Sequence, residues 1–179
     1  PTMGALHAGH LSLIRQSRAA AAVTVCSIFV NPTQFNDPAD YARYPVTLEK
    51  DIDLLEQAGC DLLFLPDVSE IYPNGTGGID RKYEIGRLET LLEGHFRPGH
   101  FQGVCRVVDR LLEIIHPDQL FLGQKDYQQC MVIRRLLELT GSAAELKIGP
   151  TLRESDGLAM SSRNVRLTPE GREKAPAIY

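Results

Sequence analysis

The sequence has few cysteines, no excess of basic residues and no long hydrophobic run. Its four cysteines are scattered without a C-x-x-C pair, a pattern that favours buried free thiols in a reducing cytoplasm over a disulfide framework or a zinc site. The net charge of −4 argues against general nucleic-acid binding, which requires a basic face. Without a run of about eighteen apolar residues, no membrane-spanning helix is predicted. We therefore expect a cytoplasmic protein that binds neither nucleic acid nor a membrane.

The length and composition are those of an ordinary folded protein. The chain has 179 residues, of which 43% are hydrophobic and 23% charged, so it suits one sizeable domain or one domain plus a piece of another. No segment repeats, and no low-complexity tract occurs. The composition turns polar after Thr151. This change predicts a first domain over 1–151 and the beginning of a second over 152–179.

Short β-branched apolar runs alternate with amphipathic segments along the first domain. This order is typical of a doubly wound parallel α/β sheet, in which ligands bind at the carboxyl ends of the strands. Strands are expected at 23–30, 61–66, 83–85, 118–123 and 145–149. Helices are expected at 10–21, 47–58, 88–93, 104–116 and 127–139. The loops after the strands should therefore gather at one edge of the sheet.

The first ten residues read as a turn that enters a helix. Gly4 and Gly9 allow close backbone approach, and His7 and His10 share one face of the first helical turn. A helix start attracts phosphate through its unpaired N–H groups and its dipole, and two imidazoles can add donors. The alternatives are one capping and one solvated histidine, which we favour for an arbitrary sequence, and a zinc pair, against which the lack of nearby ligands argues.

Further polar residues follow the expected strands. Gln34 can hold a hydroxyl and a carboxylate oxygen, whereas Asn31, before a proline, is equally well explained as a turn residue. Lys125 can neutralise a phosphate as a point charge, or it can form a solvated pair of little consequence with Asp126.

Two later loops add more basic and hydroxyl groups. Arg97 and His100 lie in an R-P-G-H loop, where a structural role is the simpler explanation for one of them. Ser161, Ser162 and Arg163 would suit a phosphate in a mobile loop, although Ser-Ser-Arg by itself is common on protein surfaces.

Together these motifs form a specific series. P-T-M-G-A-L-H-x-G-H, F-V-N-P-T-Q-F, R-Y-P, R-P-G-H-F-x-G-V, G-x-K-D-x-Q-Q and D-G-L-A-M-S-S-R-N occur in that order. The series resembles the pantoate–β-alanine ligase family, of the H-I-G-H-type nucleotidyltransferase superfamily, along almost the whole chain. The resemblance implies a Rossmann-like fold and an ATP-dependent ligase that makes pantothenate from pantoate and β-alanine through a pantoyl-adenylate, releasing AMP and pyrophosphate.

The resemblance also implies cofactors, partners and limits. ATP and Mg²⁺ would be required, and a homodimer is expected. Family members begin with a strand before P-T-M-G and continue beyond Tyr179, so we expect this chain to be a fragment that lacks the first strand and contains the start of a small C-terminal lid domain. The alternatives are a nucleotidyltransferase of the same superfamily that acts on another acceptor, and a catalytically inactive nucleotide-binding domain.

The roles implied for single residues follow from the matching motifs. The expected ATP-binding residues are Met3, Gly4, His7, His10, Gly123, Lys125, Asp126, Met160, Ser161, Ser162 and Arg163. The expected catalytic residues among them are His7, His10, Lys125, Ser161, Ser162 and Arg163. The expected substrate-binding residues are Asn31, Gln34, Tyr44, Arg97 and Gln129. Asp51 would contact Mg²⁺ through water.

Overall fold

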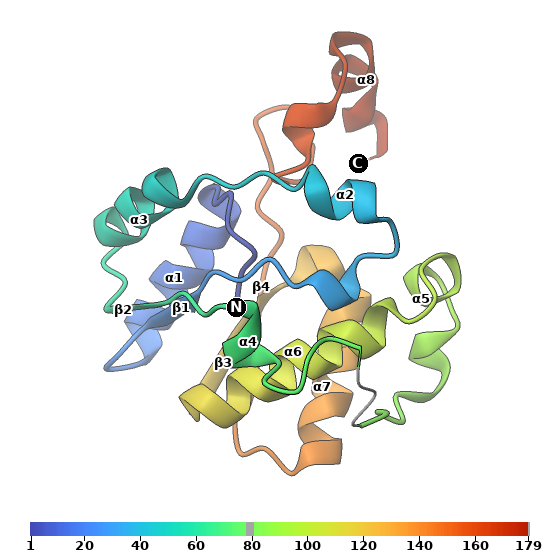
Figure 1. Ribbon diagram of the computed structural model, residues 1–179. Coiled ribbons are helices and arrows are strands. Elements are labelled where there is room, and N and C mark those ends of the chain that lie inside the picture. Colours follow the sequence, from blue (N-terminus) through green and yellow to red (C-terminus); the bar gives the residue numbers. More distant parts are fainter. Residues whose placement is uncertain (78–80, 179) are drawn as a thin grey trace.

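Helices alternate with short parallel strands in the computed structural model, which describes residues 1–77 and 81–178 (Figure 1). The strands are β1 (Val25–Ser27), β2 (Leu62–Phe64), β3 (Gln119–Gly123) and β4 (Glu145–Gly149). β1 pairs in parallel with β2, and β3 pairs in parallel with β4. The parallel α/β arrangement that the sequence predicts is therefore confirmed, while Tyr179, the last residue of the second expected domain, lies outside the described residues.

The helices include eight of α type within the described residues. They are α1 (Ala8–Ala20), α2 (Pro38–Ala42), α3 (Leu48–Gln57), α4 (Val68–Ile71), α5 (Glu93–Phe96), α6 (His100–Ile115), α7 (Tyr127–Thr140) and α8 (Pro169–Lys174). Short 3-10 turns are η1 (Pro32–Gln34), η2 (Gly86–Glu89), η3 (Gln124–Asp126), η4 (Asn164–Arg166) and η5 (Ala175–Ile178). No helix in the described ranges is long and apolar enough to cross a membrane.

The hydrophobic core has two parts. The larger part packs α6 and α7 against β3 around Val132 and Ile133, which are fully buried. The smaller part joins α1, α3 and β1 through Ile14, Cys26 and Leu55. In Figure 1, α6 and α7 lie together at one end of the molecule, while α1 and α3 lie together near β1 and β2. Burial of these apolar side chains is the main favourable contribution to folding.

Helix α1 contacts both the β1–β2 pair and the β3–β4 pair, and these contacts fix the position of its first turn. Ile14 packs in the core with β1, while Leu13 lies over the end of β4. A Cβ atom added to Gly149 would lie 2.5 Å from Leu13 Cδ2, so the Leu13 side chain occupies the space that the glycine leaves open. The first turn of α1 is thereby held at the carboxyl ends of the strands.

The two strand pairs are not hydrogen-bonded to each other in the described part of the chain. Thr2 adds a parallel bridge to Ile28, just beyond β1. A cavity of about 310 Å³ lies between β1 and β3 and is also lined by Pro1 and by residues of α6. The strands thus share one direction but form two separate ladders.

The prediction of a strand at 83–85 is wrong. Tyr83 and Ile85 are buried as an alternating pattern requires, but the backbone of Tyr83 pairs with a side chain. Gln102 Oε1 accepts from Tyr83 N at 3.0 Å, and Gln102 Nε2 donates to Tyr83 O at 2.9 Å. An amide side chain from α6 therefore takes the place of a neighbouring strand.

The prediction of a single helix at 88–93 is also wrong. The chain forms η2 and α5 instead, and Leu92 between them has a φ of +47°, which an α-helix cannot include. Helices α2 and α4 fall in segments where no helix was expected. Asp37 before Pro38 and Asp67 before Glu70 are their capping signals. Helix α6 begins at His100, four residues earlier than expected.

Candidate active site

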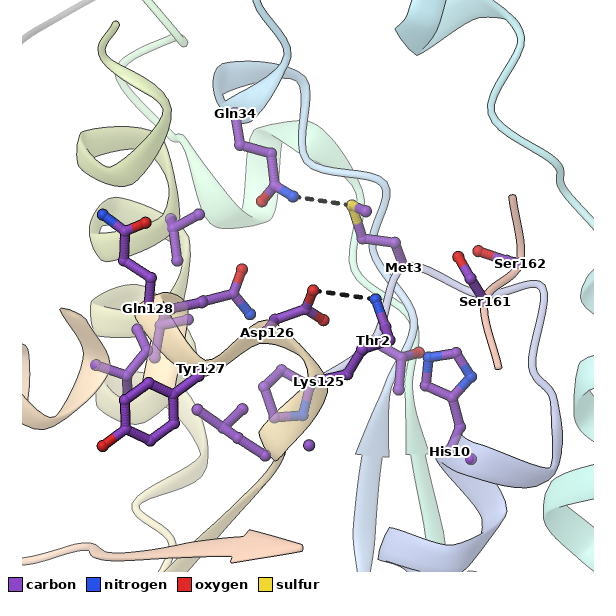
Figure 2. A pocket seen from close by; sticks show the side chains of 18 of the residues that line it. Thr2, Met3, His10, Gln34, Lys125, Asp126, Tyr127, Gln128, Ser161 and Ser162 are labelled. Atoms are coloured by element: carbon purple, nitrogen blue, oxygen red, sulfur yellow. Dashed lines mark hydrogen bonds and ion pairs between the residues drawn. The ribbon is translucent and has the colours of Figure 1, made fainter. Parts of the chain in front are cut away.

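The carboxyl ends of the strands and the start of α1 surround a cavity of about 630 Å³. It is lined by all but two of the residues that the sequence predicts for ATP, substrate or Mg²⁺. Those that line it are Met3, His7, His10, Asn31, Gln34, Tyr44, Arg97, Gly123, Lys125, Asp126, Gln129, Met160, Ser161, Ser162 and Arg163. Figure 2 shows several of them around a common space. Gly4 and Asp51 do not line the cavity.

The two histidines at the start of α1 cap the helix reciprocally. His7 is the N-cap residue, and its Nδ1 accepts a hydrogen bond from Gly9 N at 3.1 Å. His10 Nδ1 accepts from His7 N at 3.3 Å. The ring centroids are 4.0 Å apart. The sequence offered one capping and one solvated histidine as an alternative; in the structure both histidines take part in the cap, and both also line the cavity.

This capping fixes the protonation state of both rings. Because a backbone N–H can only donate, Nδ1 must be unprotonated, and each neutral ring carries its hydrogen on Nε2. Burial lowers the pKa of His10 to about 3, and the neighbouring His7 contributes to the shift. Burial, followed by the charge of Lys125, also lowers the pKa of His7. The pair therefore supplies neutral N–H donors beside a helix N-terminus.

Lys125 and Asp126 follow β3 on the opposite side of the cavity. Lys125 Nζ donates to Asp126 Oδ1 at 3.0 Å (Figure 2). The pair is solvent-exposed, with side-chain exposures of 36% and 57%, and an exposed pair of this kind contributes little to stability. An anionic ligand can therefore replace Asp126 as the partner of Lys125 at a small cost in free energy.

Two glutamines on the wall have side-chain amides suited to a polar ligand. Gln34 Nε2 lies 3.1 Å from Met3 Sδ, a weak acceptor (Figure 2). Gln129 lies in the first turn of α7 and lines the same cavity. The adjacent Gln128 has a structural task, because its amide bonds the backbone at Leu88, Leu91 and Glu93.

Both basic residues of the R-P-G-H loop line the cavity and donate to the backbone carbonyl of Gln34. His100 is buried, and its Nδ1 donates to Gln34 O at 2.8 Å; burial lowers the pKa of its imidazole. Arg97 bonds Glu93 Oε2 at 3.2 Å and Gln34 O at 3.3 Å while lining the cavity. The structural role expected for one member of this loop fits the buried His100, whose ring also borders the cavity.

The C-terminal segment reaches the cavity through residues 160–163. Tyr44 Oη lies 3.4 Å from Ser162 Oγ, and the guanidinium carbon of Arg163 lies 5.4 Å from the centroid of the Tyr44 ring. Asp40 of α2 accepts from Arg163 at 3.2 Å and from Arg166 at 2.8 Å. The Arg166 hydrogen bond, supported by Arg163, lowers the pKa of the Asp40 carboxyl. These contacts hold the segment against α2.

Asp51 anchors the loop before α1. Its carboxylate accepts from Ala5 N and Leu6 N, each at 2.8 Å, and from Thr47 Oγ1 at 3.1 Å. The side chain is almost fully buried, at 1% exposure. The structure thus gives this carboxylate a structural role, and its water-mediated contact with Mg²⁺ stays a prediction.

Replacing Asp51 by asparagine should lower the free energy of unfolding by about 2 kcal/mol, because an NH₂ group then faces donors that the carboxylate satisfies. Urea denaturation measures the change. Asp53→Asn, at an exposed position of the same helix, is the matched control. Equal unfolding free energies in the two variants would contradict the anchoring role.

The sequence did not reveal the apolar part of the cavity wall. Phe29, Phe101 and Val104 line it together with the polar groups. Their helical or strand spacing is that of ordinary core residues, so no pattern separates them from the core. They give the cavity an apolar side that suits alkyl groups of a small ligand.

Fold and cavity together define a mixed α/β protein with parallel strands, whose helix N-terminus, lysine, serines and arginine place hydrogen-bond donors around one cavity. The family model described as pantoate-beta-alanine ligase matches residues 1–179. The chain therefore belongs to the pantoate-beta-alanine ligase family.

Individual relatives agree with this assignment. A pantothenate synthetase from Cytophaga hutchinsonii is 51% identical over 179 residues, which are 100% of this chain and 62% of that protein. The crystal structure of pantothenate synthetase from Thermus thermophilus matches with a TM-score of 0.93 at 50% identity, over 100% of this chain and 64% of that one.

A third relative was crystallised with ligands. Pantoate-beta-alanine ligase from Francisella tularensis, complexed with beta-gamma ATP and beta-alanine, matches with a TM-score of 0.91 at 47% identity, over 100% of this chain and 68% of that one. The chain thus spans less than two thirds of the Cytophaga and Thermus proteins.

Proposed function

We propose that this chain carries the site at which a pantoate–β-alanine ligase activates pantoate with ATP. The observation that carries the proposal is the single cavity that collects the Nε2–H donors of His7 and His10, the ammonium of Lys125, and the amides of Gln34 and Gln129. The first three groups suit phosphate, and the two amides suit a hydroxy acid. ATP and β-alanine are supported as ligands by the complex of the Francisella relative.

The first step joins the acid to the nucleotide. A pantoate carboxylate oxygen attacks the α-phosphorus of ATP, the bond to the bridging oxygen breaks, and pyrophosphate leaves with its electron pair. Both reactants are anionic, so the chain must hold them in line and neutralise developing charge. His10 and Lys125 would donate to the phosphates, and no covalent nucleophile of the protein is required.

The second step uses the mixed anhydride. The amine of β-alanine attacks the pantoyl carbonyl carbon, AMP leaves, and the nitrogen loses a proton, which gives pantothenate. Water would destroy the intermediate, so it must be excluded. Ser161, Ser162 and Arg163 would close over the triphosphate, and their segment already contacts Tyr44.

The remaining site assignments belong to the same proposal. Met3, Gly123, Asp126 and Met160 would surround the nucleotide, since all four line the cavity. Gly4, which is outside the lining, would act through the turn before α1, where its φ is +80°. Asn31, Tyr44 and Arg97 would border pantoate or β-alanine.

Magnesium would enter with the nucleotide. The described residues contain no group of three His, Cys, Asp or Glu side chains placed to hold a metal ion. Mg²⁺ commonly binds through substrate phosphates and water with one or two carboxylates. Asp126 and Glu93 are the carboxylates among the cavity-lining residues.

The proposal extends to the architecture and setting of the chain. The two parallel strand pairs, with α1 against β3 and β4 and its Ile14 in one core cluster with Cys26 of β1, support a Rossmann-like doubly wound sheet over 1–151. Residues from 152 onward, with α8 set apart from the strands in Figure 1, would begin a C-terminal lid domain. A homodimer and a cytoplasmic location are part of the same proposal.

Replacing Gln34 or Gln129 by alanine tests the substrate. Each change should lower kcat/KM for pantoate roughly 10- to 100-fold in pantoate-dependent ATP–pyrophosphate exchange, because one hydrogen bond to a charged ligand is lost. The affinity for ATP should stay within twofold. Gln124→Ala, at an exposed position before α7, is the control. Unchanged exchange in both variants would show that another acceptor is used.

A further inference from the structure

We infer that Tyr72 is a positioning residue for Gln34, acting through Asn31, and that it helps to fix which end of the Gln34 amide faces the ligand. Tyr72, Thr33, Asn31 and Gln34 form a continuous hydrogen-bonded chain, called here the amide relay. The identity of the ligand as pantoate rests on the proposed function. The relay itself exists without the ligand.

The orientation of the Asn31 amide is fixed by its surroundings. Its Oδ1 accepts from Tyr72 Oη at 2.7 Å, from Thr33 Oγ1 at 3.0 Å and from Thr33 N at 3.3 Å. Its Nδ2 donates to Gly103 O at 3.2 Å. Because a backbone N–H can only donate and a backbone carbonyl can only accept, the amide has one satisfied orientation. The side chain is 1% exposed, so water cannot compensate for a flip.

The fixed amide of Asn31 sets the orientation of the next one. Asn31 Nδ2 also donates to Gln34 Oε1 at 3.2 Å, so Gln34 Nε2 is the end that faces Met3 across the cavity. A flipped Gln34 would place its NH₂ against the NH₂ of Asn31 and its carbonyl against the sulfur of Met3. Both contacts would then be lost.

Close packing holds the relay together. Helix α6 passes η1 so closely that a Cβ atom on Gly103 would collide with the carbonyl of Thr33. His100 from the same helix donates to the carbonyl of Gln34 at 2.8 Å. Tyr72 is buried, and the guanidinium carbon of Arg106 lies 5.3 Å from its ring centroid. Tyr72 does not line the cavity; besides the relay, it reaches the cavity wall only by packing against Phe29, at 6.3 Å between ring centroids, a contact that Tyr72→Phe keeps.

The relay has a consequence for the ligand. Gln34 Oε1 is turned toward Asn31 and its NH₂ group toward the cavity, so a ligand atom that meets this NH₂ group must be an acceptor. A carboxylate or hydroxyl oxygen fits, whereas an amide N–H does not. The relay therefore favours an acceptor oxygen of the ligand at this point of the cavity.

The relay can be tested without any ligand. In the ¹⁵N-labelled chain, the side-chain NH₂ resonances of Gln34 and Asn31 should shift in Tyr72→Phe and in Thr33→Val, each of which removes one hydroxyl donor. Tyr41→Phe is the matched control, since no hydrogen bond of its hydroxyl is found among the described residues. Resonances of Gln34 that stay in place in both relay variants would overturn the inference.

Calorimetric titration then measures the effect on ligands. Tyr72→Phe should raise the Kd for pantoate about five- to tenfold and leave the Kd for ATP within twofold. In a Gln34→Ala background the same change should have no further effect on pantoate. If Tyr72→Phe weakens the binding of pantoate and ATP equally, or weakens pantoate binding as much in the Gln34→Ala background as in wild type, Tyr72 has a merely structural role. NMR shifts in a chain that binds no pantoate would support the relay and contradict the proposed substrate.

Discussion

Replacing His10 by alanine should slow pantoate-dependent ATP–pyrophosphate exchange about 100-fold, the usual cost of removing one preorganised donor to developing negative charge. The free energy of unfolding should fall by only about 1 kcal/mol, because what the fold loses is one helix cap. Exchange kinetics and urea denaturation measure the two effects on the same preparations.

His95→Ala is the matched control for this variant, since His95 is exposed on α5 and does not line the cavity. Both quantities should stay at their wild-type values there. A large loss of stability with normal exchange in His10→Ala would mean that the histidine pair serves the fold alone.

The stability of the chain should fall between neutral pH and pH 5 in a manner that depends on His10. Its pKa in the folded chain is about 3, below the value of about 6.5 for an unfolded histidine. Between these values the unfolded chain binds more protons, so the contribution of the neutral ring is present above pH 6.5 and is lost as the pH falls. From pH 6.5 to pH 5 the loss amounts to about 2 kcal/mol.

His10→Gln isolates this effect. Glutamine at this third helical position can still reach back to the N-cap backbone N–H, but it does not titrate. The unfolding free energy of wild type should therefore drop by about 2 kcal/mol more than that of the variant between pH 6.5 and pH 5. Parallel pH dependences in the two proteins would show that His10 is protonated in the folded state.

The regular elements were largely predictable because their apolar spacing matches their burial. Helix α7 runs from Tyr127 to Thr140 and stops at Gly141, which has a φ of +67°. β3 and β4 fall within or on the expected ranges. The prediction of a strand at 83–85 was wrong because burial alternates there as in a strand, but the backbone of Tyr83 is hydrogen-bonded to the side chain of Gln102. No periodicity reveals such a partner.

The cavity was predictable to the extent that motifs mark residues at the ends of strands. Fifteen of the predicted residues line the cavity, whereas the Asp51 carboxylate accepts hydrogen bonds from Ala5 N and Leu6 N in the loop before α1. The protonation of His7 and His10 was not predictable, since it depends on burial and on which ring nitrogen meets a backbone N–H. The amide relay was equally hidden, because Asn31 and Tyr72 are far apart in the sequence and meet only through the fold.

A crystal structure of this chain with ATP and pantoate tests the central claim most directly. The account predicts the triphosphate within hydrogen-bond distance of His10 Nε2 and Lys125 Nζ, and a pantoate oxygen on Gln34 Nε2, with the carboxylate directed at the α-phosphorus. A triphosphate bound elsewhere, or pantoate held away from Gln34 and Gln129, would contradict it.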